Sequence, residues 1–233
     1  EHWSPKPGVE GSSPSTRAER GWISQPLFLF IVDKGYMTKL VIFDLDGTLL
    51  YTLEDLTKAT NYALRRMNMP ERTLDDVRRF VGNGVARLIE LAVPEGTAPV
   101  VFEQTLAIFR EYYDIHCNDN TKAYDGVIDL LRELKADGYA LAIVSNKPDS
   151  AVKELAEIYF EGIVKVAIGE SAGVAKKPAP DTVYAALKEL GMPKEGAVYV
   201  GDSEVDVMTA KNSGLPCISV LWGFREEAFL KEH

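Results

Sequence analysis

Cysteine and histidine are scarce in this chain, which has 2 Cys and 3 His among its 233 residues. Cys117 and Cys217 lie far apart in the sequence and lack the spacing of metal ligands, so a cysteine-based metal site is not indicated. The two thiols are expected to be reduced, as in a cytoplasmic protein, and a disulfide between them is the alternative.

The chain also has fewer positive than negative charges, and its apolar runs are short. Lys and Arg number 26 against 35 Asp and Glu, and the net charge of −9 argues against general nucleic-acid binding, which relies on basic surfaces. An anionic substrate is still compatible with this balance, because a bound metal and a local lysine set the field inside a pocket. The longest apolar candidate, residues 26–32, is shorter than the roughly 18 to 20 residues that a membrane helix needs. Neither nucleic acid nor a membrane is an expected partner.

The composition that remains is that of an ordinary globular protein, with 46% hydrophobic and 26% charged residues. The length fits one domain, or a core domain with a smaller insertion. Residues 1–21 are rich in Ser, Pro, Gly and Arg, and Met37 stands directly before an apolar stretch. Residues 1–36 are therefore expected to be a disordered leader, a cloning remnant or a translated upstream segment, with a signal peptide as the alternative.

Two carboxylates follow the first apolar segment, residues 39–43. They belong to Asp44 and Asp46, and a Gly and a Thr come directly after them. If the strand geometry continues that far, positions i and i+2 share a face, so both side chains point at one small volume. Two like charges this close need a cation or a proton between them. A Mg²⁺ site with an aspartate nucleophile supplies that cation, whereas an ordinary Asp-Gly turn is the structural alternative.

A helical region follows this segment. Apolar residues recur at helix spacing through residues 53–115. Breaks near Pro70 and at Gly82, and a new start at Thr97, divide the pattern into four helices. No strand pattern interrupts the region. A small all-helical cap inserted after the first strand is therefore expected, with residues 53–119 as its bounds.

From residue 124 onward, strand and helix patterns alternate. Continuous Val/Ile/Leu/Ala strands separated by amphipathic helices predict an α/β fold with a doubly wound parallel sheet, a Rossmann-like core formed by residues 37–52 and 120–233. Ligands of such sheets bind beyond the carboxyl ends of the strands. Asp44, Ser145 and Asp202 each stand where a predicted strand ends, so three strands deliver polar groups to one edge. The strands after the first are expected at residues 139–144, 164–168, 197–200 and 217–221.

Four motifs in this order resemble those of the haloacid dehalogenase-like hydrolase superfamily. They are Asp-Leu-Asp-Gly-Thr-Leu at 44–49, Ile-Val-Ser-Asn-Lys at 143–147, Lys-Lys-Pro at 176–178 and Val-Gly-Asp-Ser-Glu-Val-Asp at 200–206. The resemblance covers roughly residues 38 to 225. Residues 81–84 and 214–224 look most like the phosphoglycolate phosphatase-like branch of that superfamily.

The resemblance implies a role for each motif residue. Asp44 would be the nucleophile that forms an aspartyl-phosphate, and Asp46 would protonate the leaving group and then activate water. Lys177, the lysine directly before Pro178, would offset the charge on the nucleophile and the phosphoryl group. Ser145 and Asn146 would bind phosphate.

A Mg²⁺ ion is the cofactor that the resemblance implies. Its protein ligands would be Asp44, the backbone carbonyl of Asp46, and Asp202, since Mg²⁺ prefers oxygen ligands. Asp206, one helical turn after Asp202, would orient these ligands from behind.

The implied activity is hydrolysis of a small phosphorylated metabolite similar to phosphoglycolate. Asp46 favours phosphoryl transfer over dehalogenation, because the dehalogenases of the superfamily lack this second Asp. A phosphomutase of the β-phosphoglucomutase kind, which shares every core motif, stays open as an alternative, and so does a pyrophosphatase of the same branch. The alternative from another class is a catalytically silent binding module. A monomer or a homodimer is expected.

Substrate choice is expected in the cap, chiefly at Gly82 and Asn83. The glycine permits close backbone approach, and the loop amides suit a carboxylate such as that of phosphoglycolate. One departure from the family pattern stands at the entry to the cap, where Tyr51-Thr52 replaces the common Asp-Ser or Asp-Thr.

Overall fold

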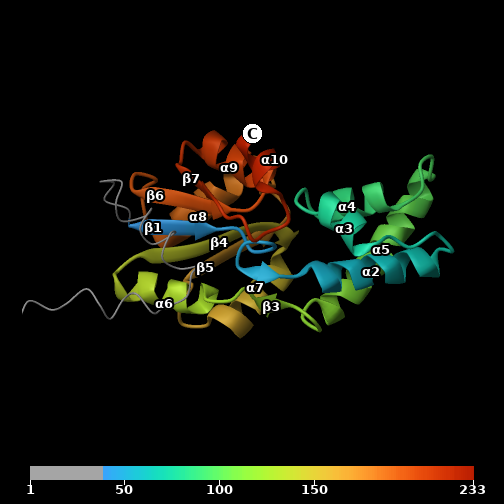
Figure 1. Cartoon of the computed structure of the whole chain (residues 1–233), viewed down its shortest axis with the longest axis horizontal. Helices are drawn as coiled ribbons and strands as arrows, with labels where there is room; N and C mark the ends of the chain where they lie inside the picture. Colours follow the sequence, from blue (N-terminus) through green and yellow to red (C-terminus); the bar gives the residue numbers. More distant parts are fainter. Residues whose placement is uncertain (1–38) are drawn as a thin grey trace, which may run out of the picture.

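The computed structural model of the chain describes residues 39–233 (Figure 1). The expectations for residues 1–36 lie outside the described residues. Within residues 39–233, no helix combines the length and the apolar character needed to cross a bilayer.

A five-stranded parallel sheet forms the centre of the molecule, in the order β5-β4-β1-β6-β7. In Figure 1, β1 runs between β6 and β4. All four residues of β1 are buried, as expected for a central strand covered on both faces. The strands are β1 (Leu40–Phe43), β4 (Ala140–Pro148), β5 (Val166–Glu170), β6 (Ala197–Gly201) and β7 (Cys217–Ser219).

Helices cover both faces of this sheet. Val41 and Phe43 of β1 pack in one apolar cluster with α6 and α7, and Leu40 and Ile42 pack in a second cluster with α8 and α9. Alternate residues of one strand therefore serve two separate cores, which confirms the doubly wound α/β fold. The helices are α6 (Val127–Ala136), α7 (Asp149–Phe160), α8 (Asp181–Leu190), α9 (Glu204–Ser213) and the C-terminal α10 (Glu227–Lys231).

Four helices lie together to one side of the sheet and form the inserted cap (Figure 1). They share an apolar cluster of their own, built around side chains such as Leu64, Ile89 and Phe109. They are α2 (Leu53–Arg66), α3 (Leu74–Phe80), α4 (Val85–Ala92) and α5 (Pro99–His116).

Two short antiparallel strands, β2 (Leu50–Tyr51) and β3 (Lys122–Ala123), join the cap to the core. The sequence analysis missed them, because two residues are too few to show a period. Asp55, in the first turn of α2, is buried and accepts hydrogen bonds from the backbone N–H groups of Asn120 and Thr121. The chain segments that enter and leave the cap are therefore tied together at one point.

The observed end of β4 differs from the predicted one. The strand was expected to end at Val144, but its backbone stays extended to Pro148, with a shift in its pairing to β5 after Val144. Ser145 and Asn146 therefore lie within the strand and not in a turn after it. Polar residues at 145–147 hid the continuation, since the apolar pattern stops at Val144.

Candidate active site

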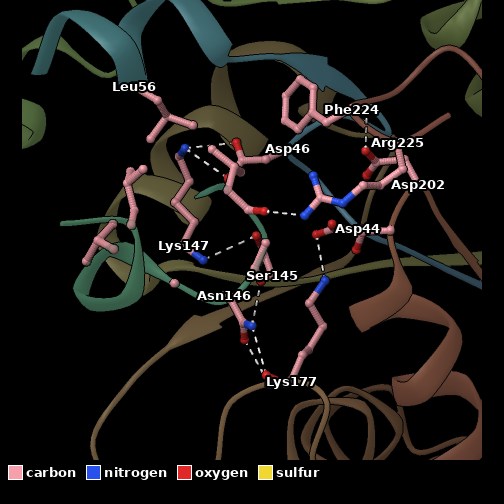
Figure 2. A pocket seen from close by; sticks show the side chains of 16 residues that line it. Asp44, Asp46, Leu56, Ser145, Asn146, Lys147, Lys177, Asp202, Phe224 and Arg225 are labelled. Atoms are coloured by element: carbon pink, nitrogen blue, oxygen red, sulfur yellow. Dashed lines mark hydrogen bonds and ion pairs between the residues drawn. The ribbon is translucent and has the colours of Figure 1, made fainter. Parts of the chain in front are cut away.

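The carboxyl ends of β1 and β6 and the last part of β4 meet in one cavity, which the cap covers. Figure 2 shows the side chains that line it, with Asp44, Ser145 and Asp202 facing the same space. The strand ends thus bring together the polar residues that the sequence placed there. The labelled lining residues are Asp44, Asp46, Leu56, Ser145, Asn146, Lys147, Lys177, Asp202, Phe224 and Arg225.

Asp44 and Asp46 line the same cavity, and each is paired with a different lysine. β1 ends at Phe43, so the strand geometry that would align the two side chains stops before them. Lys177 Nζ lies 2.8 Å from Asp44 Oδ1, whereas Lys147 Nζ lies 2.9 Å from Asp46 Oδ1. Each of the two carboxylates therefore has a buried lysine of its own.

One side-chain oxygen of Asp44 has no hydrogen bond or ion pair among the described residues. Asp44 Oδ1 accepts a hydrogen bond from the Leu45 N–H at 2.7 Å in addition to its ion pair with Lys177. Among the described residues both contacts use Oδ1, which leaves Oδ2 for an incoming group. Burial and the nearby charge of Asp206 raise the pKa of Asp44 well above its ordinary value, and Lys177 opposes this shift.

Lys177 joins two carboxylates. Its Nζ lies 2.8 Å from Asp206 Oδ1 as well as 2.8 Å from Asp44 Oδ1, and it also donates to the Tyr199 hydroxyl. Burial alone would lower the pKa of Lys177, but the charges of Asp206 and Asp44 raise it above its ordinary value. The side chain is therefore a buried cation beside Asp44.

Asp206 is saturated with donors from its own surroundings. Its Oδ2 accepts from the Ser203 hydroxyl at 2.6 Å and from the Ser203 N–H at 3.1 Å, while its Oδ1 faces Lys177 and Tyr199. Burial alone would raise the pKa of Asp206, but Lys177 and these hydrogen bonds hold it below its ordinary value. These contacts suit a group that positions its neighbours.

Asp202 is held by residues from two separate loops. Thr48 Oγ1 donates to its Oδ1 at 3.1 Å, and the Phe224 N–H donates to its Oδ2 at 2.7 Å. The loops come so near that a Cβ at Gly47 would lie 2.4 Å from Asp202 Oδ2, so only glycine fits there. Burial, reinforced by the charge of Asp206, raises the pKa of Asp202 to about 7.

Three buried carboxylates make this region suitable for a divalent cation. One oxygen from each of Asp44, Asp202 and Asp206 lies within 4.8 Å of the others. Among these described groups, Lys177 is the cation that faces the cluster, and burial, followed by the charge of Asp206, raises the pKa of both Asp44 and Asp202. An all-oxygen donor set of this charge fits Mg²⁺.

Ser145 and Asn146 lie at the same edge with different contacts. The Ser145 side chain lines the cavity, and its Oγ accepts from the Lys147 N–H at 3.3 Å. Asn146 bonds both backbone groups of Lys177 and donates to the Gly82 carbonyl of the cap at 3.0 Å. Asn146 therefore fixes the segment that carries Lys177 and links it to the cap.

The cap residues expected at the substrate separate into two groups. Gly82 lines the active-site cavity together with Gly84 and the apolar side chains of Val85 and Leu88. Asn83 lines a neighbouring groove instead, and its carbonyl accepts a hydrogen bond from Lys176 at 3.0 Å.

Lys147 is a charged lining residue to which no role was assigned from the sequence, although it ends the motif at residues 143–147. It is 3% exposed and donates both to Asp46 and to the hydroxyl of Tyr113 on cap helix α5. Tyr113 precedes Lys147 by 34 residues and belongs to the cap, so no local pattern announces this contact. The signal in the sequence that could have pointed to Lys147 was its place, since a charged residue there directly continues a buried strand.

Comparison with known proteins settles the family. The profile of haloacid dehalogenase-like hydrolases matches residues 41–220. The chain belongs to the haloacid dehalogenase-like hydrolase family. Phosphoglycolate phosphatase 1 of Pseudomonas aeruginosa is 35% identical over 199 residues, which cover 81% of this chain and 71% of that protein. The phosphoglycolate phosphatase of Pseudomonas fluorescens is 34% identical over 200 residues, covering 82% and 72%.

A solved structure agrees with this assignment. A protein from Lactobacillus delbrueckii subsp. bulgaricus, provisionally assigned as a phosphoglycolate phosphatase, superimposes with a TM-score of 0.79 at 38% identity, covering 84% of this chain and 91% of that one. The resemblance read from the motifs is confirmed, including the phosphoglycolate phosphatase-like branch. The expected enzyme class, a phosphoric monoester hydrolase, is supported by the same relatives.

Proposed function

We propose that this protein is a Mg²⁺-dependent phosphatase that hydrolyses a small phosphorylated metabolite, similar to phosphoglycolate, through an aspartyl-phosphate on Asp44. The observation that carries the proposal is the arrangement around Asp44. Its Oδ1 is held by Lys177 and the Leu45 N–H, and Asp46 lines the same cavity.

In the first half-reaction, Asp44 Oδ2 attacks phosphorus and the bond from phosphorus to the ester oxygen breaks. Asp46 donates its proton to that oxygen, so the leaving group departs as a neutral alcohol. Lys177 offsets the negative charge shared by Asp44 and the transferring phosphoryl group, and Ser145 binds a phosphoryl oxygen.

In the second half-reaction, the Asp46 carboxylate takes a proton from water, which attacks the phosphorus of the aspartyl-phosphate. Inorganic phosphate leaves, Asp44 is regenerated and Asp46 again carries the proton. Covalent catalysis of this kind divides one difficult displacement into two easier ones.

The carboxylates of Asp44 and Asp202 and the backbone carbonyl of Asp46 would hold the Mg²⁺ ion, and Asp206 would orient them. When bound, the ion supplies positive charge that neutralises the phosphoryl oxygens. Asp206 is better suited to orientation than to ligation, because its two oxygens already accept hydrogen bonds from Lys177, Tyr199, Ser203 and Asp202.

The relatives named phosphoglycolate phosphatase support a two-carbon acid as the leaving group. The cap side of the cavity supports a small one, because Leu56, Val85 and Leu88 bound it closely. Residues 53–119 act in this proposal as the cap, and residues 37–52 and 120–233 as the core. The cytoplasm and a monomer or homodimer are the setting that we propose.

The test is phosphate release from a panel of small phosphate esters, scored in parallel for isomerised products. We expect release from 2-phosphoglycolate that stops in EDTA and returns with Mg²⁺. Isomerisation without net release would favour the phosphomutase, and release from inorganic pyrophosphate alone would favour the pyrophosphatase. Full activity in chelator would remove the metal, and no turnover of any phosphate compound would favour a binding module.

A further inference from the structure

Three cations line the active-site cavity, and two of them are already committed. Lys177 is paired with Asp44 and Asp206, and Arg225 is paired with Glu204 and bonds backbone carbonyls of the cap. Lys147 is paired less fully, since Asp46 is its one carboxylate partner among the described residues and its remaining contacts there are to the neutral side chain of Tyr113.

The position of Lys147 relates it to the leaving group. Asp46 must contact the ester oxygen in order to protonate it, so the leaving group lies beside Asp46. Lys147 Nζ lies 2.9 Å from Asp46 Oδ1, and Figure 2 shows this ammonium group next to Leu56 of the cap. The ammonium group is therefore on the cap side of the cavity, away from the cluster of Asp44, Asp202 and Asp206.

The ammonium group keeps one weakly held donor. Its three N–H bonds face Asp46 Oδ1 at 2.9 Å, Asp46 Oδ2 at 3.3 Å and the Tyr113 hydroxyl, and the longer contact to Oδ2 can be exchanged for a ligand while Oδ1 keeps the ion pair. Its surroundings on the cap side are apolar, with Leu56, Val85 and Leu88 lining the cavity. A desolvated cation in an apolar wall attracts an anion more strongly than a neutral polar group, because little solvent screens the charge.

We propose that Lys147 is the specificity-determining residue that recognises a carboxylate on the leaving group, with Tyr113 holding its ammonium group from the cap. This assignment rests on the proposed phosphatase function. It moves substrate choice from the loop around Gly82 to a residue of β4, and the ligand class is a short phosphate monoester whose alcohol carries a carboxylate.

Two esters of equal carbon number isolate the effect of the carboxylate. The experiment compares kcat/KM for 2-phosphoglycolate with kcat/KM for 2-hydroxyethyl phosphate, whose leaving group is neutral. In the wild-type protein we expect a preference of about tenfold to a hundredfold for the carboxylate, the size of one buried charge-assisted hydrogen bond. Lys147→Met should bring this ratio close to one, whatever loss of rate both substrates share.

Lys176→Met is the matched control. Lys176 also crosses from the core to the cap, where it bonds the Asn83 carbonyl, but it lines the neighbouring groove and not the active-site cavity. This variant should keep the wild-type ratio. Lys147→Gln replaces Lys147→Met if the latter does not fold, and the wild-type ratio tests the proposal without any variant.

Each outcome is decisive for one of the two proposals. A wild-type ratio near one, or a preference that survives in Lys147→Met, would overturn the role of Lys147 and leave the phosphatase function standing. A proportional loss on both esters would also overturn it, since Lys147 would then act only through Asp46 or the fold. If the protein hydrolyses neither ester in the presence of Mg²⁺, although both esters are chemically intact, the proposed function itself is overturned.

Discussion

Asp44 and Asp46 are two residues apart in the chain, yet their surroundings suit them to different chemistry. Asp44 is fixed through one oxygen by Lys177 and the Leu45 N–H, which leaves the other for attack on phosphorus. Asp46 is paired with Lys147 at the cap side, where a leaving group would lie. Two identical side chains thus have different buried cations and different places in the cavity, which is compatible with the separate roles that we propose for them.

Substitution of these two residues should separate their roles. Asp44→Asn should lower kcat by at least about a thousandfold, since an amide cannot form the aspartyl-phosphate. Asp46→Asn should lower it about a hundredfold to ten-thousandfold while substrate still binds. Phosphate release with Mg²⁺ measures both, with thermal unfolding as the control for folding. More than a few per cent of wild-type activity in Asp44→Asn would rule out the covalent mechanism.

The titration of Asp202 should make both the stability of the fold and the effect of the proposed metal ion depend on pH. Its pKa rises from 3.8 to about 7 in the folded protein through burial and the charge of Asp206. The folded state therefore holds a proton that the unfolded chain releases near pH 4, and the metal-free protein loses this part of its stability as pH rises from about 4 to about 7. In the proposed function Mg²⁺ binds the deprotonated carboxylate, so its stabilising effect should grow across the same interval.

Thermal unfolding with and without Mg²⁺ at pH 5.5 and pH 8 measures this linkage. We expect a larger rise in Tm from Mg²⁺ at pH 8. Asp202→Asn, which cannot titrate and loses a charged ligand, should reduce both the rise and its pH dependence, and Asp44, whose pKa is also raised, accounts for the part that remains. An equal Mg²⁺ effect at both pH values in the wild-type protein would mean that Asp202 does not lose a proton when the ion binds.

The residues of the active site were predictable to different degrees. Asp44, Asp202 and Lys177 stand in motifs with a fixed order, and strand ends collect at one edge of a parallel sheet. The pair formed by Lys147 and Tyr113 was not predictable, because it joins the core to a helix of the cap. Contacts between separately folded layers depend on how the layers dock, which local patterns do not record.

At the level of elements, long periodic segments were predictable and short or polar ones were not. The central strands and the helices of both layers follow apolar repeats of several residues, so their positions emerged from the sequence. β2 and β3 have two residues each, and the polar end of β4 breaks the apolar run at Ser145. In both cases tertiary pairing, and not local preference, makes the backbone extended.

The connection between cap and core gives a prediction at this scale. Asp55 is 2% exposed, and its carboxylate accepts from Asn120 and Thr121, which stand just before β3. Asp55→Ala would leave these donors without their charged acceptor. The free energy of unfolding should fall by about 2–4 kcal/mol, the size expected when the charged acceptor of buried hydrogen bonds is removed.

Chemical denaturation measures this change, and Glu54→Ala is the matched control. Glu54 occupies the same first turn of α2 but lies outside this cluster, so its loss should cost less than about 1 kcal/mol. Equal effects of the two substitutions would show that the helix terminus matters and the contact to Asn120 and Thr121 does not.

On the scale of the whole molecule, one stretch of cap backbone meets three core side chains. Arg225 donates to the carbonyls of Arg78 and Val81, Asn146 to that of Gly82, and Lys176 to that of Asn83. All of these contacts use backbone acceptors, so they hold the cap over the cavity with little dependence on cap side chains. The described conformation is a closed one, in which the cap completes the wall of the active site.

Arg225 should therefore govern closure rather than substrate choice. Arg225→Met removes the donors to Arg78 and Val81 and should lower kcat/KM about tenfold for every small phosphate ester, with the ratio between esters unchanged. Hydrogen exchange at residues 78–84 should become faster in the same variant, since the cap loop would be released from the core. Arg132→Met, at an exposed position paired with Asp129 on α6, should leave rate and exchange as they are. A change in the preference between 2-phosphoglycolate and 2-hydroxyethyl phosphate would contradict this division, because it would give Arg225 the selective role proposed for Lys147.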